Sequence, residues 1–209
     1  MTAATAGPEV TIIDYGAGNL RSVAKALESL GHAPLVTNRP ADVAQARRLI
    51  LPGVGAAADT RHSLERLGLA EPIQRYLESG RPFFGVCLGL QVLLAGSEEG
   101  GWQPCLGVIP GRVRRLPGGQ KVPHMGWNQV HQRISHPLFA GIPDEANFYF
   151  VHSYYADPTD PGVVAGETEY GLVFASVLIH ANIIATQFHP EKSSDLGLRL
   201  YQNFLSWQP

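Results

Sequence analysis

The sequence has few of the features that place a protein outside the cell or in a membrane. It contains two cysteines among 209 residues, too few for a disulfide framework and typical of a reducing cytosol. The first ten residues, MTAATAGPEV, have neither a basic start nor an apolar stretch, so we expect no signal peptide. The longest charge-free stretch near the end, 172–188, is interrupted by His180, Asn182, Thr186 and Gln187, so we expect no membrane span. These absences predict a cytoplasmic protein.

Charge is also scarce. Sixteen Lys and Arg residues are balanced by 18 Asp and Glu residues, for a formal net charge of −2, and the pI is about 6.4. A chain without a basic excess has too little positive charge to bind a phosphate backbone as its main partner. No H-E-x-x-H or C-x-x-C spacing occurs, so the sequence predicts no metal site. Because no repeat and no linker divides the chain, we expect one domain over 1–209.

What the first half does contain is an alternation of apolar strands and amphipathic helices. Apolar runs rich in β-branched residues predict buried strands at 10–14, 33–37, 48–51 and 83–86. Helical spacing of apolar residues follows each run, at 20–30, 41–46, 56–79 (in two pieces divided by Gly68 and Pro72) and 88–94. Four strand–helix units in a row favour right-handed crossovers and a parallel sheet covered on both faces.

After Gly107 the pattern changes to short strands with Gly and Pro turns. We expect strands at 108–109, 112–115, 128–133 and 148–151, a closing hairpin at 173–179 and 183–187, and a last helix at 195–207. These hairpins are expected to extend the edge of the sheet. The predicted fold class is therefore a three-layer α/β fold, with a mostly parallel central sheet, helices on both faces, and antiparallel hairpins added in the second half.

The most specific local pattern is GVCLG at 85–89, between a predicted strand and a predicted helix. It has the spacing of the G-x-S-x-G nucleophile elbow, with cysteine in place of serine. A sharp strand-to-helix turn leaves no room for side chains two residues before and after the nucleophile, so both positions are glycine. The free N–H groups and the dipole at a helix start favour a thiolate. Cys87 is the predicted nucleophile, with a buried structural cysteine as the alternative.

A thiolate nucleophile needs a base that carries its proton, usually a histidine oriented by a third group. His189 ends the apolar run 183–188 and is followed by Pro190 and Glu191. Residues i and i+2 of an extended chain face the same side, so Glu191 can hold the His189 ring. The carboxyl ends of parallel strands meet at one sheet edge, where open α/β sheets bind ligands. Cys87, His189 and Glu191 form the predicted triad; the alternative for the His–Glu pair is a capped strand end with a solvated glutamate.

With these motifs the chain resembles the class I (triad) glutamine amidotransferases. GVCLGLQ at 85–91 and HPE at 189–191 are the two marks of that superfamily. Five stretches then narrow the resemblance to the glutaminase subunits of imidazole glycerol phosphate synthase: DYGAGN at 14–19, PGVG at 52–55, PHMGWN at 123–128, FVHSYY at 150–155 and HPEKS at 189–193. The similarity extends from 12 to 204, nearly the whole chain.

The resemblance implies a reaction and the residues that perform it. Cys87 would attack the side-chain amide of L-glutamine and His189 would protonate the departing ammonia, leaving a γ-glutamyl thioester that water hydrolyses to glutamate. The backbone N–H groups of Val54 and Leu88 would form the oxyanion hole. The implied glutamine-binding positions are Gly55, Gln91, Glu99, Ser153 and Tyr154. The resemblance implies no cofactor and no metal.

It also implies a partner, because no second domain exists here to use the ammonia. A separate (β/α)8 cyclase subunit would receive the ammonia in a heterodimer and form imidazole glycerol phosphate and an aminoimidazole carboxamide ribotide in histidine biosynthesis. The predicted docking face contains Asn19, Met125, Trp127, Tyr149 and Lys192, since exposed Trp, Met and Tyr are enriched in interface cores. Lys192, one of three lysines, would pair with a cyclase carboxylate; a solvated lysine beside core aromatics is the alternative.

Two points stay open at the level of sequence. Glycines flank Val54, so the Gly53–Val54 peptide is expected to rotate and to switch the oxyanion hole when the partner binds its substrate; the alternative is that PGVG is a rigid strand-ending turn that already holds the donor correctly. Three other functions also compete. A glutaminase of the anthranilate or GMP synthase kind shares the triad but usually carries a G-G-P loop, a stand-alone cysteine hydrolase would need no partner, and a non-catalytic module would not need all three triad residues.

Overall fold

The structure of the protein, a computed structural model, describes residues 9–209. The first half alternates between strands and helices: β1 (Thr11–Ile13), α1 (Leu20–Ser29), β2 (Leu35–Thr37), α2 (Pro40–Gln45), β3 (Leu49–Gly53), α3 (Ala57–Arg66), α4 (Ala70–Glu78), β4 (Phe83–Cys87) and α5 (Leu88–Gln91). The second half is mostly strand: β5 (Leu94–Ser97), β6 (Gln103–Pro104), β7 (Ile109–Arg115), β8 (His124–Gln132), β9 (Ala146–His152), β10 (Tyr154–Pro158), β11 (Val164–Glu169), β12 (Val173–His180) and β13 (Ile183–Thr186). The 3₁₀ turn η3 (Pro190–Lys192) and helix α6 (Ser194–Ser206) follow.

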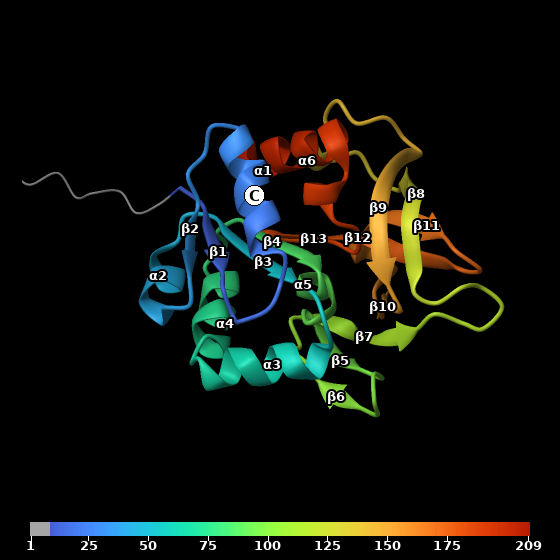
Figure 1. Ribbon diagram of the computed structural model, residues 1–209, viewed down its shortest axis with the longest axis horizontal. Helices are drawn as coiled ribbons and strands as arrows, with labels where there is room; N and C mark the ends of the chain where they lie inside the picture. Colours follow the sequence, from blue (N-terminus) through green and yellow to red (C-terminus); the bar gives the residue numbers. More distant parts are fainter. Residues whose placement is uncertain (1–8) are drawn as a thin grey trace, which may run out of the picture.

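These strands form one continuous sheet whose main path runs in the order β2-β1-β3-β4-β13-β12-β10-β7-β5-β6 (Figure 1). The five strands from β2 to β13 are parallel to one another, which confirms the predicted parallel sheet. In register, Gly53 of β3 lies beside Cys87 of β4, and Val86 lies beside Thr186 of β13. Three strand ends therefore meet at one edge of the sheet, as expected for a ligand site of an open α/β sheet.

Helices cover the parallel part of the sheet on both faces, so the predicted three layers are present. Helices α1 and α6 lie on one face, and α2, α3 and α4 lie on the other (Figure 1). Adjacent strand residues point to opposite cores: Ile12 and Phe84 pack toward α1 and α6, whereas Ile13 and Phe83 pack toward α2 and α4. Among residues 9–209, no helix is both long and apolar enough to cross a membrane.

The second half is mainly antiparallel, and β13 shows how it joins the first half. The hairpin predicted at the end of the chain is present as β12 and β13, but β13 lies inside the sheet, parallel to β4. Strands β8 and β9 form a hairpin that reaches the sheet only through β11. Strands β5, β6, β10 and β11 were not predicted. The partners of β10, strands β7 and β12, are distant in sequence, whereas β5 with β6 and β11 with β12 are local pairs that the residue pattern did not reveal.

Two predicted helix boundaries were wrong. Pro72 does not divide two helices: it lies in the first turn of α4, where a missing N–H breaks no helical hydrogen bond. The helix after Cys87 ends at Gln91 rather than 94. The backbone oxygen of Leu93 instead accepts from the N–H groups of Val108 and Ile109, so pairing across the chain overrides the helical spacing of this apolar run.

Candidate active site

Cys87 lies on a strained turn between β4 and α5. Its φ and ψ are 53° and −102°, a backbone conformation that non-glycine residues rarely adopt and that clusters at active sites. The two flanking glycines are required for space. A Cβ atom on Gly85 would lie 2.5 Å from the backbone oxygen of Gly89, and one on Gly89 would collide with the backbone oxygen of Leu51 in β3. The elbow predicted from the sequence is confirmed, and its glycines let α5 pack directly against β3 and β4.

His189 and Glu191 follow β13 at the same edge of the sheet. The Nδ1 atom of His189 lies 2.8 Å from Oε1 of Glu191, and each side chain is only 1% exposed. Two further side chains hold the carboxylate: the Asn19 amide donates to Oε1 at 3.3 Å and the Tyr201 hydroxyl donates to Oε2 at 3.4 Å. Asn19 occupies the N-cap position of α1 but makes no capping hydrogen bond. Its side chain instead orients the glutamate.

The surroundings of His189 favour its charged form. Burial by itself lowers the pKa of His189, but the negative charges of Cys87 and Glu191 outweigh burial and raise the pKa above the usual histidine range. Burial and the charge of Glu191 raise the pKa of Tyr201, which keeps its hydroxyl a donor. The Nε2 atom of His189 is buried without a hydrogen-bond partner. This nitrogen is therefore free to exchange a proton with a reacting group.

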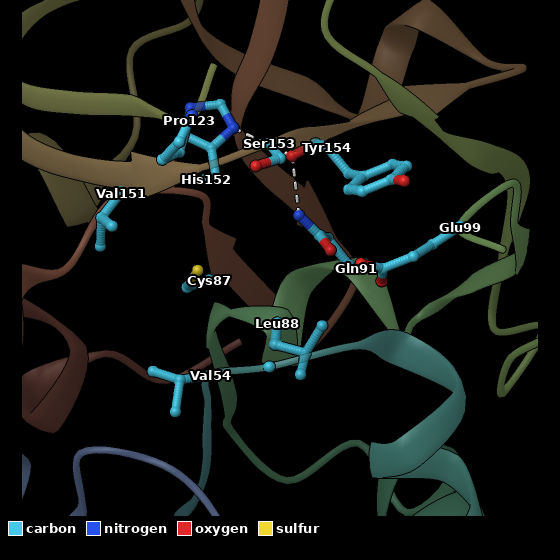
Figure 2. Close-up of a pocket in the computed structure, with 11 residues that line it drawn as sticks. Val54, Cys87, Leu88, Gln91, Glu99, Pro123, Val151, His152, Ser153 and Tyr154 are labelled. Carbon is cyan, nitrogen blue, oxygen red and sulfur yellow. Dashed lines mark hydrogen bonds between the residues drawn. The ribbon is translucent and has the colours of Figure 1, made fainter.

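A cavity of about 260 Å³ opens in front of Cys87 (Figure 2). Its lining contains every residue predicted for the oxyanion hole and for glutamine binding: Val54, Leu88, Gly55, Gln91, Glu99, Ser153 and Tyr154. Figure 2 shows Cys87 between the side chains of Val54 and Leu88 on one side and those of Val151 and His152 on the other. The loop after β3, the elbow, the loop after β5 and the β9–β10 corner thus form one pocket.

Gln91 connects the elbow to the opposite wall of this cavity. Its Nε2 donates to the backbone oxygen of Tyr154 at 2.8 Å and to Oε1 of Gln187 at 3.1 Å. Both of its N–H donors are therefore used, which leaves its amide oxygen as the group that can accept from a ligand. On another wall, the carboxylate of Glu99 accepts from the backbone N–H of Ala57 at the start of α3.

Sequence reasoning missed Gln187. This side chain is fully buried, and its Nε2 donates to the sulfur of Cys87 at 3.6 Å. The sequence could have indicated this position, because Gln187 precedes His189 by two residues. In an extended segment, two such residues face the same side. Pro123, Val151 and His152 also line the cavity without having been predicted.

Of the five predicted docking residues, Met125, Trp127 and Tyr149 lie on the hairpin of β8 and β9, and Lys192 lies nearby in η3. Asn19, at the start of α1, instead holds Glu191. Met125 is 61% exposed and Trp127 is 53% exposed, and the ring of Trp127 packs edge-on against that of its cross-strand partner Tyr149. The Nζ atom of Lys192 lies 5.8 Å from the centre of the Tyr149 ring. We call these four residues the β8–β9 surface. It adjoins the cavity, because Val151, which lines the cavity, is paired with Met125.

One group of possible metal ligands occurs among residues 9–209. The Nδ1 atom of His131 lies 3.1 Å from both Oδ2 of Asp144 and Oε1 of Glu145. All three side chains are exposed, and none of them lines the cavity at Cys87. Hydrogen bonding between these surface groups explains the cluster fully.

Comparison with known proteins agrees with this geometry. Residues 11–206 match the family described as glutamine amidotransferase class-I. The imidazole glycerol phosphate synthase subunit HisH of Dehalococcoides mccartyi (strain CBDB1) is 52% identical over 195 residues, 93% of this chain and 95% of that protein. The protein of the same name from Syntrophotalea carbinolica (strain DSM 2380 / NBRC 103641 / GraBd1) is 52% identical over 202 residues, 93% of this chain and 98% of that protein.

A solved structure described as a glutamine amidotransferase has the same fold. It matches with a TM-score of 0.74 at 22% sequence identity, covering 94% of this chain and 96% of the other. With a nucleophile elbow, an adjoining His–Glu pair and relatives of this similarity, the chain belongs to the class-I glutamine amidotransferases, and within them to the HisH subunits of imidazole glycerol phosphate synthase.

Proposed function

We propose that this chain hydrolyses L-glutamine to glutamate and ammonia with Cys87, His189 and Glu191, and that it delivers the ammonia to a separate (β/α)8 cyclase subunit. The observation that carries the proposal is the strained Cys87 turn at the cavity together with the buried His189–Glu191 pair, whose Nδ1 and Oε1 atoms are 2.8 Å apart and whose imidazole interacts with Cys87. We also propose that residues 1–209 act as a single glutaminase domain in the cytoplasm and that catalysis needs no cofactor.

In this mechanism the sulfur of Cys87 attacks the amide carbon of glutamine. His189 receives the thiol proton at Nε2 and gives it to the departing ammonia, so that a γ-glutamyl thioester remains. Water, deprotonated by His189, then releases glutamate and restores the thiol. Glu191 keeps the His189 ring in one orientation and stabilises its charged form, while Asn19 and Tyr201 hold the carboxylate in place.

The oxyanion formed in both steps would be held by two backbone N–H groups. Leu88 supplies one at the start of α5, directly after the nucleophile. Val54 supplies the other from the loop after β3, whose last residue Gly53 is paired with Cys87. Removing one such donor typically lowers the rate by roughly 10²–10³-fold. The rotation of the Gly53–Val54 peptide would therefore control activity strongly.

The far end of the cavity is suited to the amino-acid end of glutamine. The Glu99 carboxylate and the free amide oxygen of Gln91 are acceptors for its ammonium group. Gly55, Ser153 and Tyr154 line the cavity and would hold the carboxylate. The cavity volume of about 260 Å³ is small, which favours an amino acid over a peptide.

The β8–β9 surface is the proposed docking site for the cyclase subunit, in a heterodimer that serves histidine biosynthesis. Ammonia released into water would be protonated and lost, so the partner has to cover the cavity. Exposed Trp127 and Met125 next to the cavity are side chains of the kind found in interface cores. Lys192 directly follows the triad glutamate and is proposed to pair with a cyclase carboxylate.

A glutaminase for another synthase, such as the anthranilate or GMP enzyme, is the second candidate, since it would use the same triad. Relatives that are 52% identical over more than nine-tenths of this chain carry the HisH name. The end of β3 and the loop that follows read PGVG at 52–55 and lack the G-G-P pattern usual in those other glutaminases. Both observations favour imidazole glycerol phosphate synthase as the enzyme that this subunit serves.

The test uses the complex of this chain with the cyclase subunit. Cys87→Ala should lower glutamine-dependent synthesis by at least ~10³-fold, while synthesis from added ammonium salt continues at the wild-type rate. Cys105→Ala is the matched control, because Cys105 is buried outside the cavity and burial raises the pKa of its thiol to about 11; both activities should survive. Equal loss of both activities in Cys87→Ala would assign Cys87 a structural role and overturn the proposal.

A further inference from the structure

Besides the His189–Glu191 pair, two buried histidines contact each other beside the active site. They take no part in the mechanism above. His124 begins β8 and His152 ends β9, and the two residues are direct cross-strand partners. Their side chains are 3% and 5% exposed, and Nδ1 of His124 lies 2.9 Å from Nε2 of His152. His152 also lines the cavity that contains Cys87.

The position of every proton in this pair follows from its partners. The backbone oxygen of Tyr154 only accepts, so the His152 Nδ1 atom 2.9 Å away carries a proton and donates it. In a neutral ring, Nε2 of His152 is then an acceptor, and Nδ1 of His124 must be its donor. The remaining Nε2 of His124 accepts from the Asn128 amide at 3.3 Å. The hydrogen bonds therefore run in one direction, from Asn128 through both histidines to Tyr154.

Both rings are held in the neutral state that this arrangement needs. Burial lowers the pKa of His124 to about 4 and that of His152 to about 3, and the positive charge of His189 also lowers the pKa of His152. The His124 ring stacks on Tyr170, with ring centres 3.9 Å apart, and on Phe150 at 5.0 Å. The His152 ring in turn packs against Phe174, with ring centres 5.1 Å apart.

The chain of hydrogen bonds spans a corner of the fold that forms one wall of the cavity. Strand β9 pairs only with β8, whereas β10 lies in the main sheet between β12 and β7, and Ser153 alone separates β9 from β10. The bond from His152 to the Tyr154 carbonyl crosses this corner. The same carbonyl accepts from Gln91, so its position determines where Gln91 presents its free oxygen.

We propose that His124 and His152 are positioning residues for glutamine binding, which hold the Ser153–Tyr154 wall of the cavity in a fixed place relative to β8. The same strand β8 carries the exposed side chains of Met125 and Trp127, so the pair also links the proposed docking strand to the substrate wall. This inference rests on the proposed glutaminase function of the cavity. It assigns neither histidine a proton-transfer step.

The first test reads the tautomers of the unmodified protein. Long-range 1H–15N NMR spectra of the full chain labelled at histidine should show both His124 and His152 neutral and protonated at Nδ1 between pH 6 and 8 (a window set by the usual histidine pKa of about 6.5). Protonation of His152 at Nε2, or a charged ring, would break the directed chain and overturn the proposal without any variant.

The second test separates positioning from general damage. His152→Phe and His124→Phe keep an aromatic ring in each place but remove the hydrogen bonds. In the complex with the cyclase subunit, each should raise the KM for glutamine by roughly 10-fold, the usual effect of losing a buried hydrogen bond, with kcat changed less than about 3-fold. The double variant should resemble either single variant, because one chain of bonds is broken in all three.

A conservative variant and a matched control complete the design. His152→Asn retains an N–H donor near the Nδ1 position for the Tyr154 carbonyl but loses the bond to His124, so its KM should rise less than that of His152→Phe. His136→Phe removes a hydrogen-bonded, aromatic-packed histidine that lies away from the cavity, and its KM should be unchanged. A fall in kcat at constant KM, or additive effects in the double variant, would overturn the proposal; loss of activity in Cys87→Ala tests the glutaminase function separately.

Discussion

The backbone of Gly89 packs so closely against the carbonyl oxygen of Leu51 that no Cβ atom fits between them. Gly89 lies in α5, two residues after Cys87, and Leu51 lies in β3, the strand that leads to Val54. This contact holds α5 against β3, and the residues that begin α5 and follow β3, Leu88 and Val54, both line the cavity. The glycine of the elbow is thus a packing requirement between two elements and not a flexible joint.

The first prediction follows from that contact. Gly89→Ala should lower the free energy of unfolding by about 1–3 kcal/mol, the range for overpacking a close-packed site, and should lower glutaminase turnover because α5 is pushed away from β3. The control is Gly118→Ala, since a Cβ there meets nothing within 4 Å. Chemical denaturation and glutaminase assays of both variants check it. Wild-type stability in Gly89→Ala would show that the contact relaxes freely.

The second prediction concerns the charge of His189. Because Cys87 supplies the largest effect that opposes burial, Cys87→Ala should lower the pKa of His189 toward the value that burial favours. Glu191→Gln should also lower this pKa, since it removes the second negative charge. NMR titration of the histidine ring in the full chain measures both shifts. An unchanged pKa in both variants would mean that neither charge acts on the ring.

The third prediction concerns the loop after β3. Gly55 has a φ of +105° with open space where a Cβ would lie, so Gly55→Ala adds backbone strain, about 1–2 kcal/mol, without a clash. We expect the loop to leave its present conformation and glutaminase turnover in the complex to fall. Gly80→Ala is matched to it, because Gly80 has a φ of +76° and equally open surroundings before β4. It should lose stability but keep its turnover.

The fourth prediction tests the β8–β9 surface with two tryptophans of similar exposure. Trp127→Ala should weaken binding to the cyclase subunit by at least ~10-fold, since buried interface tryptophans often contribute about 2 kcal/mol. Trp102→Ala should leave the affinity unchanged, although Trp102 is 58% exposed and Trp127 is 53% exposed. Trp102 lies between β5 and β6, away from β8. Titration calorimetry measures the affinity of each variant for the cyclase subunit. Equal affinities for both variants would place the interface elsewhere.

The fifth prediction is acid sensitivity. The pKa values of His124 and His152, lowered to about 4 and 3 by burial, lie below the unfolded value of about 6.5. Between the folded and unfolded pKa values, the unfolded chain binds more protons than the folded chain. The free energy of unfolding therefore falls as pH falls from about 6.5 toward 4, by up to ~1.4 kcal/mol per pH unit for each ring. His136, whose pKa burial also lowers, adds to this slope. Denaturation at several pH values should show a shallower slope in His124→Phe.

The sequence by itself determined the parts of this protein that depend on neighbours along the chain. Strand–helix alternation predicted the parallel sheet because each unit spans a short segment. The GVCLG and HPE motifs predicted Cys87, His189 and Glu191 because a sharp turn and an i, i+2 pair impose local constraints on residue type. The motif resemblance then pointed to the pocket residues, and all of them line the cavity.

Only the tertiary structure decided which distant groups complete the site. Asn19 lies 172 residues from the Glu191 that it orients, and Gln187 lies 100 residues from Cys87. The His124–His152 pair exists because β8 and β9 align in one register, and strand β10 pairs with β7 and β12, which are distant in sequence. Periodicity reports which face of an element is buried but not which residue it meets there. Those partners depend on strand order and register, which the whole chain sets together.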